Sequence, residues 1–271
     1  MLRILKKREI GSLSKIITSR IVTLQPYNAK IENNRKKFGS LLDEIFWWEN
    51  KMRKLFLTSA GLPKETKDIF LNFLRKNPGR NNVAFIPTAS DPEENKSYVE
   101  RDKKTLQDIG FKIKEIDLKN ENKESLLNKM SECDIIFVEG GNTYYLLGQV
   151  RKSGFDKIIG QLLDEGKIYV GVSAGSYIAA PTIEAAGWKH TDPDRNAVKL
   201  KDSTALNLVP FIVTAHYNRE KYRVAVEAGV AKSKYPVVAL YDTQAVQVEG
   251  DKYQIVGEGR KEFFNGFKEI K

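Results

Sequence analysis

The sequence predicts an α/β fold, a three-layer sandwich in which helices cover both faces of a mostly parallel, twisted sheet. From residue 54 onward, short apolar runs alternate regularly with longer segments of helical periodicity. Each apolar run is rich in β-branched or aromatic residues and is bounded by turn-forming or charged residues. Strands that alternate with helices favour parallel pairing, because each helix carries the chain back across the sheet.

Seven runs predict strands. Six are continuously apolar, as expected for strands buried on both faces, at residues 55–57, 83–86, 135–138, 168–172, 211–213 and 237–240. The seventh, at residues 112–116, alternates polar and apolar residues. Farther along, residues 245–248 and 253–256 flank Glu249-Gly250-Asp251, which predicts a C-terminal β-hairpin.

Helical periodicity lies between the strands. It predicts helices near residues 64–76, 93–109, 122–131, 143–152, 155–165 and 219–233. No linker divides residues 52–271, so we expect one domain there. In sheets of this kind ligands bind beyond the carboxyl ends of the strands, so functional residues are sought at those ends.

Composition excludes several classes of protein. No stretch of the 271 residues approaches the roughly 18 consecutive apolar residues that a spanning helix needs, so we expect no membrane insertion. One cysteine, Cys133, excludes an intramolecular disulfide framework and a cysteine-based metal site. Two histidines make a histidine-rich metal centre improbable. We therefore expect no metal and no cofactor.

The positive charge is concentrated near the start of the chain. The net charge is +10, and residues 1–51 hold eleven basic and five acidic residues. These residues lack the strand and helix rhythm, so we expect a poorly ordered or appended extension, followed by a cytoplasmic catalytic domain at 52–271. Spaced basic residues and serines also loosely resemble an organelle presequence. Nucleic-acid binding through this basic segment is an alternative, but we do not expect it of the domain.

A candidate nucleophile ends the apolar run at residues 168–172. Ser173 stands in a GxSxG context formed by Gly171 and Gly175, between a predicted strand and a small-residue helix. Such a sharp turn presents the hydroxyl outward, and the N–H of Ala174 would point to where an oxyanion develops. The pattern alone fixes three positions and occurs by chance, but the strand-to-helix context favours function.

A second turn has the same organisation. The run at residues 135–138 leads through Gly140 and Gly141 into a helix that Asn142 or Thr143 can cap. Gly141 could supply a second oxyanion donor, although an ordinary tight turn would use the same glycine. If the two strands are adjacent, the two loops face one crevice.

A base is needed to take the proton of Ser173, and imidazole is the usual acceptor near neutral pH. His216 follows the strand at residues 211–213, whereas His190 lies in a polar loop. The strand-end position favours His216.

The imidazole needs an acceptor for its other N–H. Asp242 follows the strand at residues 237–240, although it could equally form a turn. Asp192, Asp194 and Asp202 are alternatives from one loop. An α/β-hydrolase is a poor fit, because its acid precedes a distant histidine, and here no histidine follows His216.

Four segments in order resemble one family. They are EGGNTYYLL at 139–147, GVSAGSYIAAPTIE at 171–184, ALNLVPFIVTAHY at 205–217 and ALYDTQAV at 239–246. Over residues 53–260 the chain resembles the aspartyl dipeptidase (peptidase E) family of serine peptidases. That family's domain is similar to the class I glutamine amidotransferase fold, a flavodoxin-like arrangement.

The resemblance implies roles for individual residues. Ser173 matches the nucleophile, His216 the base and Asp242 the acidic member. Gly141 and Ala174 match the oxyanion donors. Serine, histidine and acid then follow one another in the order that this family uses.

The resemblance also places two residues at the substrate. Asn142 lies beside it, and Arg219 corresponds to the arginine thought to meet an acidic side chain. Two segments depart from the aspartyl-specific members. Residues 185–190 read AAGWKH in place of a Thr-Asn-Asp stretch, and only two residues separate His216 from Arg219. A strict preference for aspartate is therefore not expected.

These observations predict a serine peptidase that hydrolyses short peptides through an acyl-enzyme. Amidotransferase chemistry uses a cysteine at the elbow, whereas Cys133 stands at the wrong end of a strand. A binding or sensory module that retains the crevice without turnover is the alternative from another class. Neither the preferred peptide nor the oligomeric state can be predicted from the sequence.

Overall fold

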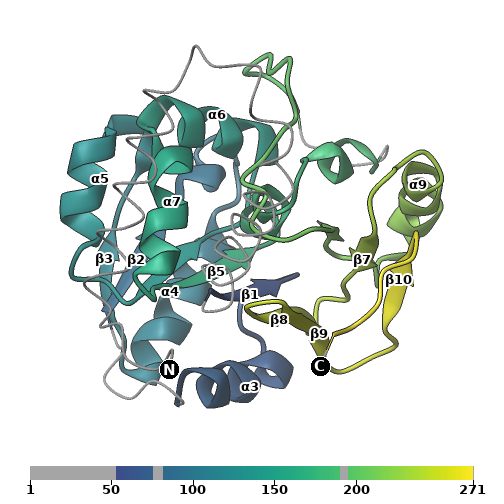
Figure 1. The fold of residues 1–271 in the computed structure, drawn as a ribbon, viewed down its shortest axis with the longest axis horizontal. Coiled ribbons are helices and arrows are strands. Elements are labelled where there is room, and N and C mark those ends of the chain that lie inside the picture. Colours follow the sequence, from purple (N-terminus) through teal and green to yellow (C-terminus); the bar gives the residue numbers. More distant parts are fainter. Residues whose placement is uncertain (1–52, 76–81, 190–194, 271) are drawn as a thin grey trace, which may run out of the picture. The chain divides into compact units, whose positions relative to one another are not determined.

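The computed structural model describes residues 53–75, 82–189 and 195–270. Its larger sheet has seven strands in the order β3-β2-β4-β5-β1-β8-β9 (Figure 1). The strands are β1 (Lys54–Thr58), β2 (Asn82–Ile86), β3 (Lys112–Glu115), β4 (Ile135–Val138), β5 (Ile168–Val172), β8 (Gln244–Glu249) and β9 (Lys252–Gly257). The first five in this order are parallel, whereas β8 runs antiparallel to β1 and β9 antiparallel to β8. Gly250, at φ 67°, lies in the turn between β8 and β9.

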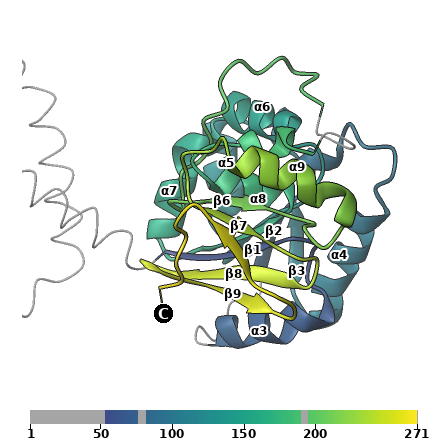
Figure 2. The same cartoon turned by 90° about the vertical axis from the view of Figure 1, so that its right-hand side faces the viewer.

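Helices cover both faces of this sheet, which confirms the predicted three-layer α/β architecture. They are α3 (Lys64–Arg75), α4 (Ser97–Ile109), α5 (Lys123–Met130), α6 (Thr143–Ser153), α7 (Phe155–Asp164) and α8 (Ala174–Ala179). The remaining helix, α9 (Glu220–Val230), packs instead with strands of a second, smaller sheet. Side chains alternate along β1: Phe56 packs with α3 and α4, whereas Leu55 and Leu57 belong to the core formed with α5 to α8. Figure 2 shows α3 against β8 and β9.

The sequence assigned the strands near residues 211–213 and 237–240 to the same sheet, and the structure corrects this. They form β6 (Ile212–Thr214) and β7 (Val237–Ala239), which pair in parallel in a second sheet with β10 (Glu262–Phe264). Because β8 occupies the free edge of β1, that edge is closed to β6 and β7. Figure 1 shows β7 and β10 beside α9, separate from strands β1 to β5 of the larger sheet.

Several boundaries also differ from prediction. The helix expected from residue 93 begins at Ser97, because the Asn95 side chain accepts the Ser97 N–H at 3.0 Å in a turn that precedes it. The helix expected at 219–233 ends at Val230. The prediction for residues 1–51 concerns a segment outside the described residues, as does the boundary at residue 52. Within the described ranges, no helix combines the length and apolar character that crossing a membrane requires.

Two glycines bring the candidate nucleophile loop against its neighbours. A Cβ on Gly175 would lie 2.1 Å from the carbonyl oxygen of Val138, and one on Gly171 would lie 2.6 Å from the carbonyl carbon of Gly175. These separations are below any real carbon contact, so both positions require glycine. The GxSxG spacing therefore reflects close packing of α8 against β4 and β5.

Candidate active site

Ser173 forms the turn between β5 and α8. Its backbone has φ 45° and ψ −102°, a strained conformation for a residue with a side chain. Two hydrogen bonds hold it: the Ser173 N–H donates to the Thr58 carbonyl at 3.0 Å, and its own carbonyl accepts the Tyr177 N–H at 2.9 Å. The surrounding backbone thus fixes the turn that presents the hydroxyl.

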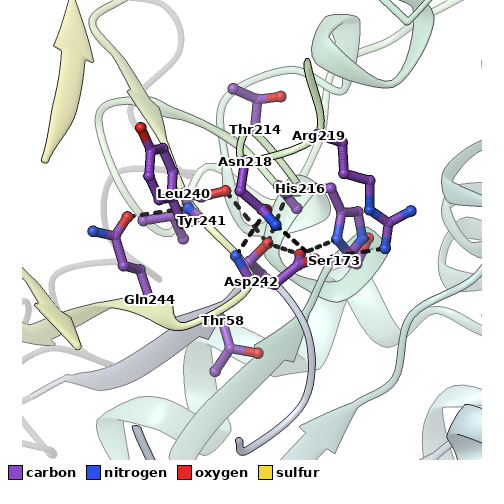
Figure 3. A network of polar contacts seen from close by, with 12 residues as sticks. Thr58, Ser173, Thr214, His216, Asn218, Arg219, Leu240, Tyr241, Asp242 and Gln244 are labelled. Atoms are coloured by element: carbon purple, nitrogen blue, oxygen red, sulfur yellow. Dashed lines mark hydrogen bonds and ion pairs between the residues drawn. The ribbon is translucent and has the colours of Figure 1, made fainter. Parts of the chain in front are cut away.

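The structure brings Ser173, His216 and Asp242 together from two sheets. His216 Nε2 lies 3.3 Å from Ser173 Oγ, and His216 Nδ1 hydrogen-bonds Asp242 Oδ1. Figure 3 shows these contacts as a continuous path through the imidazole. His216 follows β6 and Asp242 follows β7, and since these strands are parallel neighbours their carboxyl ends meet. The two oxygens contact the imidazole on opposite ring nitrogens.

Ser59 joins the two sheets at this point, and the sequence analysis missed it. The residue follows β1, the neighbour of β5, and its Oγ accepts the backbone N–H of His216 at 2.7 Å. The same hydroxyl donates to Asp242 Oδ1 at 3.2 Å. Applying the strand-end rule to β1 as well as to β5 would have found it. Ser59 therefore fixes the positions of the histidine and the aspartate.

The second oxygen of Asp242 is also held. Asn218 Nδ2 donates to Asp242 Oδ2 at 3.4 Å, while the Asp242 N–H donates to Asn218 Oδ1 at 3.1 Å. Arg219 Nη2 lies 3.6 Å from Asp242 Oδ2, so the arginine predicted to meet substrate is already an ion-pair partner of the carboxylate.

Among the alternatives for the acid, Asp202 is not brought to the site. Asp202 pairs with Arg151 at 3.1 Å and accepts the Thr204 N–H at 2.9 Å, in a loop that does not line the cavity described below. His190, Asp192 and Asp194 lie outside the described residues.

The charges around His216 favour its neutral form. Burial lowers the pKa of His216, and the positive charges of Lys189 and Arg219 lower it further, against the opposing hydrogen bond with Asp242. Burial of Asp242 favours its protonated form, but the hydrogen bond and charge of His216 and the charge of Arg219 outweigh it, so the pKa of Asp242 falls to about 2. At neutral pH an ionised carboxylate thus accepts from Nδ1, and Nε2 is free to accept a proton.

These residues line a cavity of about 460 Å³. Gly141 also lines it, with φ 134°, and a Cβ there would lie 2.2 Å from the Ala89 carbonyl oxygen, so only glycine fits. Ala174 is fully buried as the first residue of α8. Because β4 and β5 are adjacent, the two glycine-containing loops lie side by side, as the sequence analysis required for a shared crevice.

Asn142 is the residue that caps α6, one of the two candidates that the sequence offered for this role. Its Oδ1 accepts the Tyr145 N–H at 2.9 Å and so caps α6, while its Nδ2 donates to the Arg195 carbonyl at 3.1 Å. Asn142 is not among the residues that line the cavity. Its side chain holds two segments together.

The cavity wall contains two buried carboxyl groups that the sequence analysis did not single out. Glu139 Oε1 accepts the Gly140 N–H at 2.8 Å, but Oε2 has no hydrogen-bond partner among the described residues. Asp102 Oδ1 pairs with Arg101 at 2.9 Å, and its Oδ2 likewise has no such partner. Burial raises the pKa of both groups, and the Asp102 charge adds to the shift of Glu139. The sequence did carry a signal for Glu139, because a charged residue directly after the apolar strand β4 lies at the strand end where ligands bind.

Cys133 takes no part in this site. It is buried ahead of β4, its Sγ donates to the Lys129 carbonyl at 3.7 Å, and burial raises the pKa of the thiol. It does not line the cavity. The amidotransferase alternative therefore finds no cysteine where it would need one.

Comparisons with known proteins point to one family of peptidases. The model of peptidase family S51 matches residues 55–256. An uncharacterized peptidase of Listeria monocytogenes is 35% identical over 201 residues, covering 73% of this chain and 96% of that protein. A Drosophila melanogaster protein named probable alpha-aspartyl dipeptidase is 30% identical over 204 residues, covering 72% of this chain and 80% of its own.

A solved structure agrees as well. The crystal structure of a Listeria monocytogenes protein provisionally assigned as peptidase E has a TM-score of 0.65 and 32% identity, covering 77% of this chain and 100% of that one. The fold and these matches define a serine-type peptidase. The chain belongs to peptidase family S51.

The neutral state of His216 can be tested by NMR titration, because the chain has two histidines in all. We expect one imidazole signal to titrate below the ordinary value of 6.5 and to disappear in His216→Gln. Asp242→Asn should lower that midpoint further, because it removes both the hydrogen bond and the negative charge that oppose the shift. A His216 signal that titrates at or above 6.5 would contradict this electrostatic account.

Proposed function

We propose that this peptidase hydrolyses short peptides close to a free amino terminus, with Ser173 as nucleophile, His216 as general base and Asp242 as the acid that orients the imidazole. The observation that carries the proposal is the path of contacts from Ser173 Oγ through His216 to Asp242 in a single cavity. The separation of 3.3 Å between Oγ and Nε2 is long for a hydrogen bond, and catalytic hydrogen bonds of this kind commonly shorten when substrate binds.

Acylation begins when Ser173 Oγ bonds to the peptide carbonyl carbon and its proton passes to His216 Nε2. Asp242 stabilises the imidazolium that forms. The carbon–nitrogen bond then breaks, and the imidazolium gives its proton to the leaving amine nitrogen. The acyl group remains on Ser173 as an ester.

Deacylation repeats these steps with water. Nε2 of His216 takes a proton from a water molecule as the water oxygen bonds to the ester carbonyl carbon. The bond to Ser173 Oγ breaks, Oγ recovers the proton from the imidazolium, and the carboxylic acid product leaves.

The oxyanion of each tetrahedral intermediate would be held by the backbone N–H groups of Gly141 and Ala174. Ala174 opens α8, where the first N–H groups have no acceptor within the helix, and Gly141 lines the cavity. In comparable enzymes the loss of one such donor slows turnover by about 10² to 10³.

The buried carboxyl groups support recognition of a free amino terminus. Glu139 Oε2 and Asp102 Oδ2 have no hydrogen-bond partner among the described residues, and both residues belong to the wall of the cavity that holds Ser173. An ammonium group would supply N–H donors and would also favour ionisation of the two carboxyl groups. This feature favours cleavage near the amino terminus over cleavage within a long chain.

We do not propose strict specificity for aspartate, although one relative is named an alpha-aspartyl dipeptidase. Arg219, the expected partner of an acidic side chain, is engaged by Asp242 at 3.6 Å. The segment AAGWKH at residues 185–190 further separates this chain from the aspartyl-specific pattern.

Ser173→Ala tests the proposed nucleophile directly. We expect hydrolysis of a dipeptide library to fall to the background rate, while the far-UV circular dichroism and the thermal unfolding midpoint stay close to those of the unchanged protein. Residual hydrolysis equal to that of the unchanged protein would refute the assignment. Absence of hydrolysis in both proteins would favour the silent binding module.

Ser59→Ala tests the positioning of the histidine. Loss of Oγ leaves the partly buried His216 N–H without its acceptor, at a cost of up to about 1–3 kcal/mol that a shift of the imidazole away from Ser173 would relieve, so we expect kcat to fall roughly tenfold with KM little changed. Ser131→Ala is a matched control, because that hydroxyl donates to the Asn128 carbonyl beside α5 and not at the cavity. Equal kcat values for the two variants would show that Ser59 does not position the imidazole.

A further inference from the structure

Lys189 is a buried cation in the wall of the Ser173 cavity. Its residue is 7% exposed, and its Nζ donates to the hydroxyl of Tyr177 at 2.7 Å. The ammonium also lies 5.3 Å and 5.0 Å from the ring centroids of Tyr177 and Tyr222. Two aromatic rings and one hydroxyl therefore hold the ammonium in place.

The described part of this environment provides no negative charge to pair with the ammonium group. No carboxylate lies within 4.0 Å of Lys189 Nζ among the described residues. The Tyr177 hydroxyl is already shared, since it accepts the Ala215 N–H at 3.0 Å and contacts Thr214 Oγ1 at 3.4 Å. An ammonium has three donors, and a buried charge is normally paired, so Lys189 has capacity for a further acceptor.

A second buried lysine shows the contrast within the same molecule. Lys167, 9% exposed, donates to the carbonyl oxygens of Ser131 at 2.9 Å and Cys133 at 2.7 Å. Two backbone acceptors take two of the three donors of Lys167, and the residue does not line the cavity. Lys167 is thus accounted for by local structure, whereas Lys189 is not.

The other cations of the cavity wall are already paired. Arg101 lies 2.9 Å from Asp102 and Arg219 lies 3.6 Å from Asp242. Within the described part of the wall, Lys189 is the cation that has no carboxylate partner. Its positive charge acts on the site, since it contributes to the lowered pKa of His216. An anion bound in the cavity would therefore form an ion pair with Lys189.

We propose that Lys189 is a specificity-determining residue that binds a carboxylate of the peptide held in this cavity. The proposal rests on the proposed function, because it concerns the substrate of the same site. The carboxylate has two possible sources: the side chain of the residue whose carbonyl is attacked, or the α-carboxylate of the residue that leaves. Both present the same chemistry to the ammonium.

Binding to the Ser173→Ala protein tests the proposal without turnover. Isothermal titration with Asp-Leu, Asn-Leu and their two C-terminal amides removes each carboxylate separately. A hydrogen bond between charged groups contributes about 1.5–3 kcal/mol, so loss of the relevant carboxylate should weaken binding roughly tenfold or more. The peptide pair that shows this loss identifies the source of the carboxylate.

Adding Lys189→Met should remove that discrimination, leaving less than about a twofold difference between charged and neutral peptides. Lys221→Met is the matched control, because Lys221 Nζ lies 4.7 Å from the same Tyr222 ring but the residue is exposed and does not line the cavity. It should keep the full discrimination. If Lys189→Met does not fold, Lys189→Gln provides the same readout with a donor to Tyr177 retained.

Full discrimination in the Lys189 variants, or no carboxylate dependence in any of the four peptides, would overturn the inference. Turnover by the unchanged protein is measured separately. If the unchanged protein hydrolyses peptides but their binding does not depend on Lys189, the proposed function stands and this inference is wrong. If binding depends on Lys189 but the unchanged protein hydrolyses no peptide, this inference stands and the proposed function is wrong.

Discussion

The position of one imidazole between two sheets is the constraint on which the site depends. Ser173 ends a strand of the seven-stranded sheet, whereas His216 and Asp242 end strands of the three-stranded sheet. The 3.3 Å contact between Ser173 Oγ and His216 Nε2 therefore exists only while the two sheets keep their separation. Ser59 sets that separation locally, because one hydroxyl from β1 contacts both the histidine backbone and the aspartate carboxylate.

Close backbone packing provides the other half of the geometry. Gly171 and Gly175 allow α8 to lie directly against β4 and β5, and this contact holds Ser173 in its strained turn. The same packing brings the Gly141 loop to the edge of the cavity. Charge then acts on this fixed frame: burial and nearby cations keep His216 neutral, while Asp242 stays ionised beside it. In the proposed function, geometry supplies the nucleophile and electrostatics supplies its base.

Most of the larger sheet could be predicted from the sequence, because its strands are continuous apolar runs whose boundaries are local. The second sheet could not, since the pairing of β6 with β7, and of β8 with β1, is decided by partners distant in the chain. The residues of the proposed triad were found from strand-end positions and family resemblance together. Ser59 also follows a strand, so its position carried a signal, but its contacts with His216 and Asp242 become visible only in three dimensions. Lys189 lies in a polar segment that carries no local signal, and its burial and contacts likewise appear only in the structure.

Activation of Ser173 by His216 is the central claim, and the rate of its reaction with a fluorophosphonate probe measures it most directly. The account predicts a single adduct on the peptide that contains Ser173, formed at least about a hundredfold more slowly in His216→Ala, as expected when a positioned general base is removed. Equal labelling rates in the two proteins, or an adduct at another serine, would contradict it.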